Sequence, residues 1–407
     1  MPDLVPATGT VHWVGAGLST GSGLAALCAH TDGVRLWHRT AERAAEALDR
    51  LGLTGRAEPL AHTLDALTAR LAPGDVVVSM LPASDHAALL AACVTRRAHF
   101  ACSSYVSDAV LEQVPAATGA GLVVLTEAGL DPGVDHLFAH SLVARARQAV
   151  GDDTAASYRL TSYCGGIPAV PDDFRYRFSW APLGVLNALR SPARYIEDGT
   201  ETVVGRPWEA TREHLVDGEA FEVYPNRDSV PFIGQYGLPR AWKPLTFVRG
   251  TLRPDGWLRA WDAVFDELKA GDDARIAALA QELAAAHPTT ETDRDRVVLA
   301  VSLEVHVPGD REGDGGGNAT GDADGRAEGA ADGAAWSGSY VLDLEGDEEE
   351  SAMARCVSRP LALGVRHILD GALPPGLSRA AETAPRSEAW LAELGDQGIE
   401  FTLRVED

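Results

Sequence analysis

The stretch Val11–Cys28, VHWVGAGLSTGSGLAALC, joins a short β-rich run to a glycine-rich turn and the start of an alanine-rich helix. Gly15-Ala16-Gly17 is typical of a loop that cradles the phosphates of a dinucleotide. The same stretch contains Gly17-Leu18-Ser19-Thr20-Gly21, which matches the Gly-x-Ser-x-Gly elbow of serine hydrolases. In the first interpretation Ser19 is a turn residue, and in the second it is a nucleophile.

The position of this motif in the chain favours the dinucleotide loop. An elbow serine follows several strands that have already built a sheet. Here the motif follows the first strand, where backbone N–H groups and a helix N-terminus meet a pyrophosphate. Thr20 replaces the third glycine of Gly-x-Gly-x-x-Gly, with Gly21 and Gly23 just beyond it. We therefore interpret Ser19 as a turn residue that donates a hydrogen bond to a phosphate.

Strand-like and helical runs alternate over the first 130 residues. Apolar strands are predicted at 33–37, 75–82, 98–102 and 121–125, and the run at 41–51 is helical. This alternation indicates a doubly wound parallel sheet, covered by helices on both faces. Residues 1–130 are thus expected to form a dinucleotide-binding domain.

Residues 131–384 are expected to form a second, mixed α+β domain. Strands are predicted at 157–164 and 297–307, with 340–344 as the antiparallel partner of the latter. Between these partners, the segment 308–339 is dominated by Gly, Ala and Asp, which predicts a mobile insertion without a core of its own. A strand-like ending at 399–403 predicts that the segment 385–407 rejoins the first domain.

The end of the second predicted strand indicates which dinucleotide binds. An NAD-specific loop places a carboxylate here to hold the ribose 2′-hydroxyl, whereas this chain has Trp37-His38-Arg39-Thr40. An arginine and a hydroxyl suit a 2′-phosphate, which favours NADP. The alternative is that Arg39 is a surface residue capping the next helix.

Composition excludes several classes of partner. The 407 residues carry a formal net charge of −24, with a pI near 4.8, which argues against binding to nucleic acid or anionic membranes. The five cysteines lack a C-x-x-C spacing and give no zinc signature, so no metal is expected. Neither a leader sequence nor a membrane span is apparent, and a cytoplasmic location is expected.

Motifs beyond residue 127 carry a family resemblance. In order, they are EAGLDPGVDHLFAH from Glu127, SYCGGIP from Ser162, YPNRDSVPF from Tyr224, VRGTLRPDGW from Val248 and ESAMARCVSRP from Glu350. Together with the glycine loop, this succession resembles the saccharopine dehydrogenase family from about Val11 to the C-terminus. The resemblance implies an NADP-binding Rossmann domain and an α+β domain that binds substrate and forms a homodimer. It also implies reduction by NADPH of an imine formed between an amino-acid amine and an aldehyde, which interconverts saccharopine with glutamate and 2-aminoadipate semialdehyde.

Matching positions supply candidate site residues. The resemblance implies cofactor contacts at Gly15, Gly17, Leu18, Ser19, Thr20, His38, Arg39, Thr40, Leu81, Pro82 and Ser179. It implies substrate contacts at Ser104, Tyr105, Asp131, Arg227, Thr251, Leu252 and Arg253.

The chemistry of the implied substrate agrees with these residues. Saccharopine carries three carboxylates and two nitrogens, so its site needs arginine forks, for which Arg227 and Arg253 are candidates, and a carboxylate. Asp131 is that carboxylate, although with Pro132 after it, it is also a candidate helix cap. Tyr105 is a candidate proton relay. His136 is either an acid–base partner or a core histidine.

One departure from the family pattern leaves the substrate open. Leu183 stands where the family pattern predicts an arginine, so the substrate could carry one carboxylate fewer than saccharopine. The alternatives are a related condensation of another amine and aldehyde, of the carboxy-polyamine or opine type, and a cofactor-binding relative without turnover. The presence of Asp131, Arg227 and Arg253 argues against the last.

Overall fold

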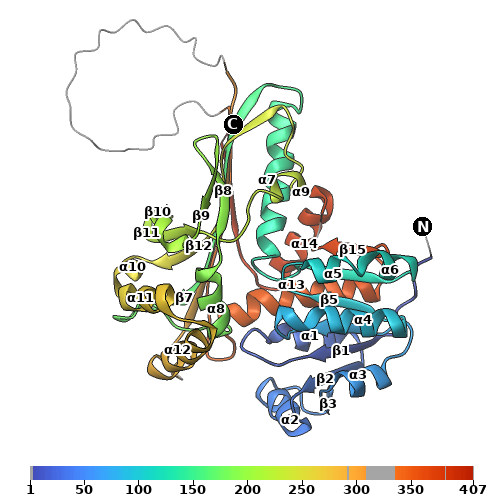
Figure 1. Cartoon of the computed structure of the whole chain (residues 1–407). Helices are drawn as coiled ribbons and strands as arrows, with labels where there is room; N and C mark the ends of the chain where they lie inside the picture. Colours follow the sequence, from blue (N-terminus) through green and yellow to red (C-terminus); the bar gives the residue numbers. More distant parts are fainter. Residues whose placement is uncertain (1–2, 291–292, 309–334, 381, 407) are drawn as a thin grey trace, which may run out of the picture.

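The computed structural model describes residues 3–290, 293–308, 335–380 and 382–406, which form two β-sheets with helices packed around them. Figure 1 shows the two sheets side by side, with the long helix α7 (Val134–Val150) rising between the first domain and the upper part of the second sheet.

The first sheet is parallel and confirms the doubly wound fold. Its strand order is β15-β6-β5-β4-β1-β2-β3, so β1, which precedes the glycine loop, is an interior strand between β4 and β2. The strands are β1 (Thr10–Val14), β2 (Gly33–His38), β3 (Glu58–Ala61), β4 (Val76–Ser79), β5 (His99–Cys102), β6 (Val123–Thr126) and β15 (Gly376–Arg379).

Helices cover both faces of this sheet, as the continuous apolar strands predicted. Val11 and Trp13 of β1 are buried in one core, whereas Val14 is buried in a second core on the opposite face. The helices of this part of the chain are α1 (Ser22–His30), α2 (Ala41–Arg50), α3 (Leu64–Arg70), α4 (His86–Arg96), α5 (Asp108–Leu111) and α6 (Val114–Gly119).

The second sheet is mixed and contains nine strands. Its main order is β10-β11-β12-β7-β13-β14-β16, with β8 and β9 attached beside β12. The antiparallel pair predicted at 297–307 and 340–344 is confirmed as β13 and β14. The strands are β7 (Ala156–Pro168), β8 (Ala193–Glu197), β9 (Thr200–Val204), β10 (Arg212–Val216), β11 (Glu219–Pro225), β12 (Trp242–Pro254), β13 (Asp295–His306), β14 (Trp336–Glu345) and β16 (Thr402–Glu406).

One apolar core joins the two sheets. It contains Trp13 of the first sheet, Leu142 of α7 and Leu299 of the second sheet. A separate aromatic core, which includes Trp257 and Trp261, holds the outer helices. The remaining helices are α8 (Pro182–Arg190), α9 (Phe232–Gln235), α10 (Trp257–Ala260), α11 (Asp262–Ala270), α12 (Asp273–Ala286), α13 (Ala352–Leu369) and α14 (Ala384–Asp396).

The expected course of the C-terminal segment is wrong. The last strand, β16, pairs with β14 in the second sheet and does not rejoin the first domain. The segment that does return is α13 with β15, which lies parallel to β6 at the edge of the first sheet. Because β15 occupies the edge beside β6, the last strand pairs instead with the free side of β14.

The expected insertion at 308–339 lies largely outside the described residues. Its last residues belong to β14, which begins at Trp336. Among the described helices, none combines the length and apolarity that crossing a membrane requires.

Candidate active site

The glycine loop follows β1 directly and has the geometry of a phosphate cradle. Gly15 has φ +102°, and a Cβ there would lie 3.1 Å from the carbonyl oxygen of Met80. A larger residue would therefore be strained where the loop passes the end of β4. Gly17 faces open space, and the Thr20 N–H donates to its carbonyl at 3.0 Å. No histidine of the described residues hydrogen-bonds Ser19, which supports its interpretation as a turn residue.

Helix α1 begins at Ser22 and lies unusually close to α13. A Cβ at Gly23 would overlap the backbone carbonyl of Ser358, so this glycine permits the contact between the two helices. The Ser22 N–H donates to Glu350 Oε1 at 2.6 Å. The first turn of α1 is therefore fixed by the segment that leads into α13.

The other expected cofactor residues lie near the ends of β2 and β4 and beside β7. His38 ends β2, and Thr40 is the N-cap of α2, accepting from the Arg43 N–H at 3.3 Å. Thr40, and not Arg39, thus caps the helix. The side chain of Leu81 lies against Gly15, and Pro82 precedes the short turn before α4. Ser179 lies beside Gly166 of β7, and its buried hydroxyl has no partner among the described residues.

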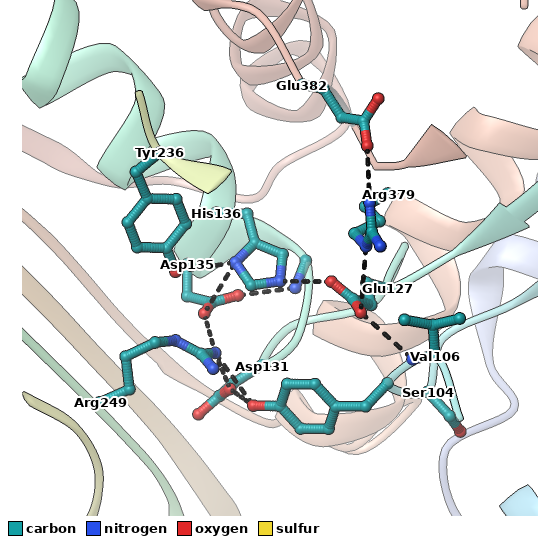
Figure 2. A network of polar contacts seen from close by, with 12 residues as sticks. Ser104, Val106, Glu127, Asp131, Asp135, His136, Tyr236, Arg249, Arg379 and Glu382 are labelled. Carbon is teal, nitrogen blue, oxygen red and sulfur yellow. Dashed lines mark hydrogen bonds and ion pairs between the residues drawn. The ribbon is translucent and has the colours of Figure 1, made fainter. Parts of the chain in front are cut away.

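Three side chains from different elements meet beyond the carboxyl ends of β5 and β6. Tyr105 Oη donates to Asp131 Oδ1 at 2.6 Å, and Arg249 Nη2 donates to both the Asp131 carboxylate and the Tyr105 hydroxyl at 2.9 Å (Figure 2). Doubly wound folds place ligands beyond the carboxyl ends of their strands. Asp131 and Tyr105 are therefore brought together as expected, with Arg249 between them and the second sheet.

A second layer of buried polar groups supports this cluster. Asp135 forms an ion pair with Arg249 and accepts the Gly133 N–H at 2.6 Å. The ring of His136 lies between Tyr236, at 2.9 Å from Nδ1, and Glu127, at 3.1 Å from Nε2. Both ring nitrogens are thus engaged by protein groups. Figure 2 shows these contacts continuing from Glu127 toward Arg379.

The surroundings of Asp131 and Asp135 shift the pKa values of these two aspartates in opposite directions. Burial and the neighbouring Asp135 carboxylate raise the pKa of Asp131, despite the opposing charge of Arg249. Burial also acts to raise the pKa of Asp135, but the charges of His136 and Arg249 outweigh it and lower that pKa. Burial raises the pKa of Tyr105 well above its ordinary value. Asp131 is therefore the carboxylate of the pair that accepts a proton more readily.

Arg227 and Arg253 differ from Arg249 because no carboxylate of the described residues pairs with them. The guanidinium of Arg227 lies 5.4 Å from the centroid of the Tyr105 ring. Arg253 is only 5% exposed and lies over the rings of Tyr176, Tyr224 and Trp257. Its Nη1 donates to the carbonyl of Leu252, and its buried Nε has no partner. A buried cation in this state is available to an anionic ligand.

Strand alternation separates the expected substrate residues on β12. Side chains along a strand point alternately to opposite faces. Leu252 is fully buried in an apolar core together with Val248, on the face away from Arg249, Thr251 and Arg253. The Leu252 side chain is therefore turned away from the site, and only its backbone is available for the expected contact with substrate. The same alternation could have identified Arg249 from the sequence, because it places Arg249 on the same face of β12 as Thr251 and Arg253.

The structure also shows what surrounds Asp131, Ser104 and Cys164. Asp131 is not a helix cap, because α7 begins at Val134 with Gly133 as its N-cap. Ser104 follows β5, and its carbonyl accepts the Glu127 N–H at 3.0 Å, which ties the two strand ends together. Cys164 is buried and burial raises its pKa, as expected of a wall residue and not a nucleophile.

Comparison with known families agrees with this architecture. Residues 11–125 match the model of the saccharopine dehydrogenase NADP binding domain, and residues 129–399 match the model of the saccharopine dehydrogenase C-terminal domain. The chain belongs to the saccharopine dehydrogenase family. The family resemblance of the motifs is thus confirmed, and the glycine loop lies within the family's NADP-binding domain.

Individual members of the saccharopine dehydrogenase family are similar over part of their length. The NADP+-dependent, L-glutamate-forming saccharopine dehydrogenase of Pyricularia oryzae is 40% identical over 198 residues, which cover 47% of this chain and 42% of that protein. The enzyme of the same description from Saccharomyces cerevisiae is 39% identical over 215 residues, which cover 51% of this chain and 47% of that protein. The matched segments thus span less than half of either relative.

A solved structure extends the likeness in fold over the whole chain. The apo L-Glu-forming saccharopine dehydrogenase from Saccharomyces cerevisiae superposes with a TM-score of 0.76 at 24% identity, covering 98% of this chain and 100% of the other. The arrangement of both sheets is therefore that of the family.

Proposed function

We propose that this chain is an NADP-dependent oxidoreductase that interconverts saccharopine with L-glutamate and 2-aminoadipate 6-semialdehyde through an imine. The observation that carries the proposal is the cluster of Asp131, Tyr105 and Arg249, beside the two arginines that lack a carboxylate partner, Arg227 and Arg253. This combination offers one proton acceptor and two anion-binding groups at the ligand-binding edge of a dinucleotide fold.

The residues around the glycine loop fit NADP. Gly17 leaves room for close approach of a pyrophosphate, and Gly15 keeps the loop against β4. Beyond the end of β2, arginines and a histidine stand in place of the carboxylate that selects NAD. Bound NADPH supplies the hydride that reduces the carbon–nitrogen double bond.

The cluster around Asp131 supplies the proton transfers. The glutamate ammonium loses a proton to the Asp131 carboxylate, and the neutral amine then adds to the aldehyde carbon. A proton moves from the added nitrogen to the oxygen, and protonation of the resulting hydroxyl by Asp131, directly or through Tyr105, releases water and leaves the protonated imine. In the oxidative direction the same groups act in reverse, and water adds to the imine before the aldehyde and amine separate.

The cations have distinct roles in this proposal. Arg227 and Arg253 bind substrate carboxylates, because each has donors that the protein leaves unused. Arg249 is already paired with Asp131 and Asp135, so it positions the carboxylates and tunes their charge. His136, with both nitrogens engaged, is a positioning residue and not the acid–base partner that the sequence left open. The expected homodimer and cytoplasmic location are parts of the same proposal.

The decisive measurement is formation of NADPH when the purified chain is mixed with NADP+ and saccharopine. We expect turnover by the wild-type chain and a loss of about 100-fold in kcat/KM for Arg227→Ala, because one charge-assisted carboxylate contact disappears. Arg240→Ala, which removes another exposed arginine of the same region, serves as the matched control and keeps wild-type activity. Absence of turnover with saccharopine in the wild-type chain would remove the named substrate.

A second candidate keeps the chemistry and changes the amine. Leu183 lies in the first turn of α8 and is 40% exposed, and it occupies the position where the family pattern predicts a cation. A substrate with one carboxylate fewer, of the carboxy-polyamine or opine type, fits this change. A panel of amines and aldehydes followed by NADPH consumption separates the two candidates, and failure of every pair would favour a cofactor-binding protein without turnover.

A further inference from the structure

A buried glutamate and a buried histidine lie directly behind the Asp131 cluster. Glu127 follows β6 immediately, His136 lies in the first turn of α7, and each is 2% exposed. Their side chains meet at 3.1 Å between His136 Nε2 and Glu127 Oε2 (Figure 2). In the proposed mechanism neither residue exchanges a proton with the substrate, so this buried contact has a different task.

The backbone is strained at Glu127. Its φ is +55°, in the left-handed region that residues other than glycine rarely adopt. Its N–H donates to the Ser104 carbonyl at 3.0 Å, and its Oε1 accepts the Val106 N–H at 3.1 Å. Strained residues of this kind persist at functional sites, where the surrounding structure fixes them. The other carboxylate oxygen of Glu127 is thereby directed at His136.

Both ring nitrogens of His136 face carboxylates. Nε2 faces Glu127, whereas Nδ1 lies 3.3 Å from Asp135 Oδ2 and 2.9 Å from the Tyr236 hydroxyl. A neutral ring with its proton on Nε2 would turn the lone pair of Nδ1 toward the Asp135 carboxylate, which is repulsive. A charged ring donates from both nitrogens and removes this repulsion. The geometry therefore favours the imidazolium form of His136.

His12 shows that a buried histidine beside a carboxylate need not be charged. Its Nε2 lies 3.1 Å from Asp75 Oδ2, but its Nδ1 accepts the indole N–H of Trp37 at 3.1 Å. That nitrogen carries no proton, so the ring of His12 is neutral. At His136 the corresponding nitrogen faces a second carboxylate instead.

An aromatic ring contacts both His136 and Arg249. The Phe232 ring of α9 stacks on the His136 ring with 5.3 Å between the centroids, and the Arg249 guanidinium lies 4.1 Å from the centroid of the Phe232 ring. An aromatic face attracts a cation. Phe232 therefore stabilises a positive charge on either neighbour.

The charge of His136 acts on the aspartate that exchanges the proton. Burial and the Asp135 carboxylate raise the pKa of Asp131, whereas the charges of Arg249 and His136 oppose this rise. The other titratable groups that face Asp131, His136 or Glu127 are Cys102, Tyr105, His140, Cys164, Tyr236 and Arg379. Burial raises the pKa values of the two thiols and the two tyrosines and lowers the pKa of His140, so these five groups are uncharged near neutral pH.

We infer that Glu127 is a positioning residue for the proton transfer at Asp131. It holds the His136 ring in the imidazolium form, and this charge keeps Asp131 ionised and ready to accept a proton from the substrate amine. The proton passes only between the substrate nitrogen and Asp131, while His136 keeps both ring protons and Glu127 stays ionised. The inference rests on the proposed function and adds to it a residue outside the expected site.

The first test is the pH dependence of kcat/KM for saccharopine oxidation in Glu127→Gln. The amide removes the charge and keeps the size of the side chain, so the His136 ring becomes neutral and Asp131 binds its proton more tightly. The acidic limb should move to higher pH by about one unit, and the rate at high pH should stay within about three-fold of wild type. His136→Gln should move the limb in the same way, and the double variant should move it no further.

A matched control makes the same substitution elsewhere. Glu388 is an exposed residue that pairs with Arg145 of α7, and Glu388→Gln should leave the limb in place. A limb that stays in place in Glu127→Gln would overturn the inference. A rate that falls equally at every pH in that variant would also overturn it, because Glu127 would then have only a structural role.

A spectroscopic measurement tests the charge without substrate. In the full chain with nitrogen-labelled histidine, the two ring nitrogens of His136 should give imidazolium signals at about pH 7.5, where an exposed imidazole is largely neutral. The signals of His136 are those missing from His136→Gln, and the signals of His12 should be neutral. A neutral His136 ring would overturn the inference, even if Glu127→Gln failed to fold. Absence of saccharopine turnover in the wild-type chain would contradict the proposed function and leave these signals to decide the inference.

Discussion

At the scale of single residues, the site depends on two aspartates that share one guanidinium. Asp131 and Asp135 both contact Arg249 Nη2, yet Asp135 also contacts the His136 ring and accepts the Gly133 N–H. Pairs of carboxylates whose surroundings differ in this way divide the acid and base roles between them. Asp135 stays ionised and holds the arginine, whereas Asp131 is left to exchange a proton.

Asp131→Asn tests this division. The amide keeps the shape of the side chain but accepts no proton, so kcat for saccharopine oxidation should fall by about 100-fold or more. In the wild-type chain, the rate should fall as pH drops through the raised pKa of Asp131, and this acidic limb should be missing in the variant. Thermal unfolding serves as the control for folding. A variant that keeps both the rate and the limb would assign the proton transfer to another group.

At the scale of elements, two glycines of one short motif have different tasks. Gly23 lets α1 approach α13, and Gly17 leaves open space where the pyrophosphate is expected. The first is a requirement of packing and the second a requirement of binding. Their substitution by alanine should therefore affect different measurements.

We expect Gly23→Ala to destabilise the fold by about 1–3 kcal/mol, because its Cβ overlaps the Ser358 carbonyl and α1 must move. Gly17→Ala, where a Cβ meets nothing, should unfold in urea like the wild-type chain but bind NADPH more weakly. Urea titrations and NADPH fluorescence measure the two effects separately. Equal stability of the two variants would contradict the close packing of α1 against α13.

At the scale of the whole molecule, the two sheets are held together by a common core and by a chain that crosses between them repeatedly. After the second sheet is built, the chain returns to the first with α13 and β15 and leaves it again for β16. The site lies where the sheets meet, since Asp131 comes from the first and Arg249 from the second. Anything that loosens the junction should therefore affect both stability and activity.

His140, buried in α7 at this junction, should make the stability of the fold depend on pH. Burial, followed by the charge of His136, lowers its pKa to about 4. The unfolded chain binds this proton near pH 6.5, whereas the folded chain binds it only near pH 4. The free energy of unfolding should therefore keep its full value above pH 6.5 and decrease as pH falls toward 4. The loss is on the order of 3 kcal/mol. Urea unfolding of the wild-type chain and of His140→Gln, which lacks this titration, at several pH values measures the effect. A wild-type stability that stays level over this range would contradict the lowered pKa.

Local patterns predicted the first domain well because each of its elements is specified by neighbouring residues. The alternation of apolar strands, the glycine turn and the helix after it are all properties of short windows, and the strands at β1, β2, β4, β5 and β6 appear where expected. The antiparallel pairing of β13 with β14 was predicted for the same reason. The short strand β3, which contains Pro59 and is partly exposed, gave no such signal.

The candidate site was predictable only in part. Asp131 and Tyr105 were found by their motifs and do meet, whereas Arg249 was missed. The part that Arg249 plays depends on which face of β12 is turned toward the site. Leu252 is the opposite case. Its motif was recognised in the sequence, but its side chain lies in the apolar core on the other face of β12.

The sequence by itself determined a dinucleotide fold, its cofactor loop and the residue types of the site, because backbone geometry and hydrophobic periodicity are local. Only the tertiary structure decided where the last strand pairs and which arginine contacts both aspartates. Those outcomes depend on contacts between residues more than a hundred positions apart, such as Asp131 and Arg249. They also depend on sheet edges that are free only once the rest of the chain is in place.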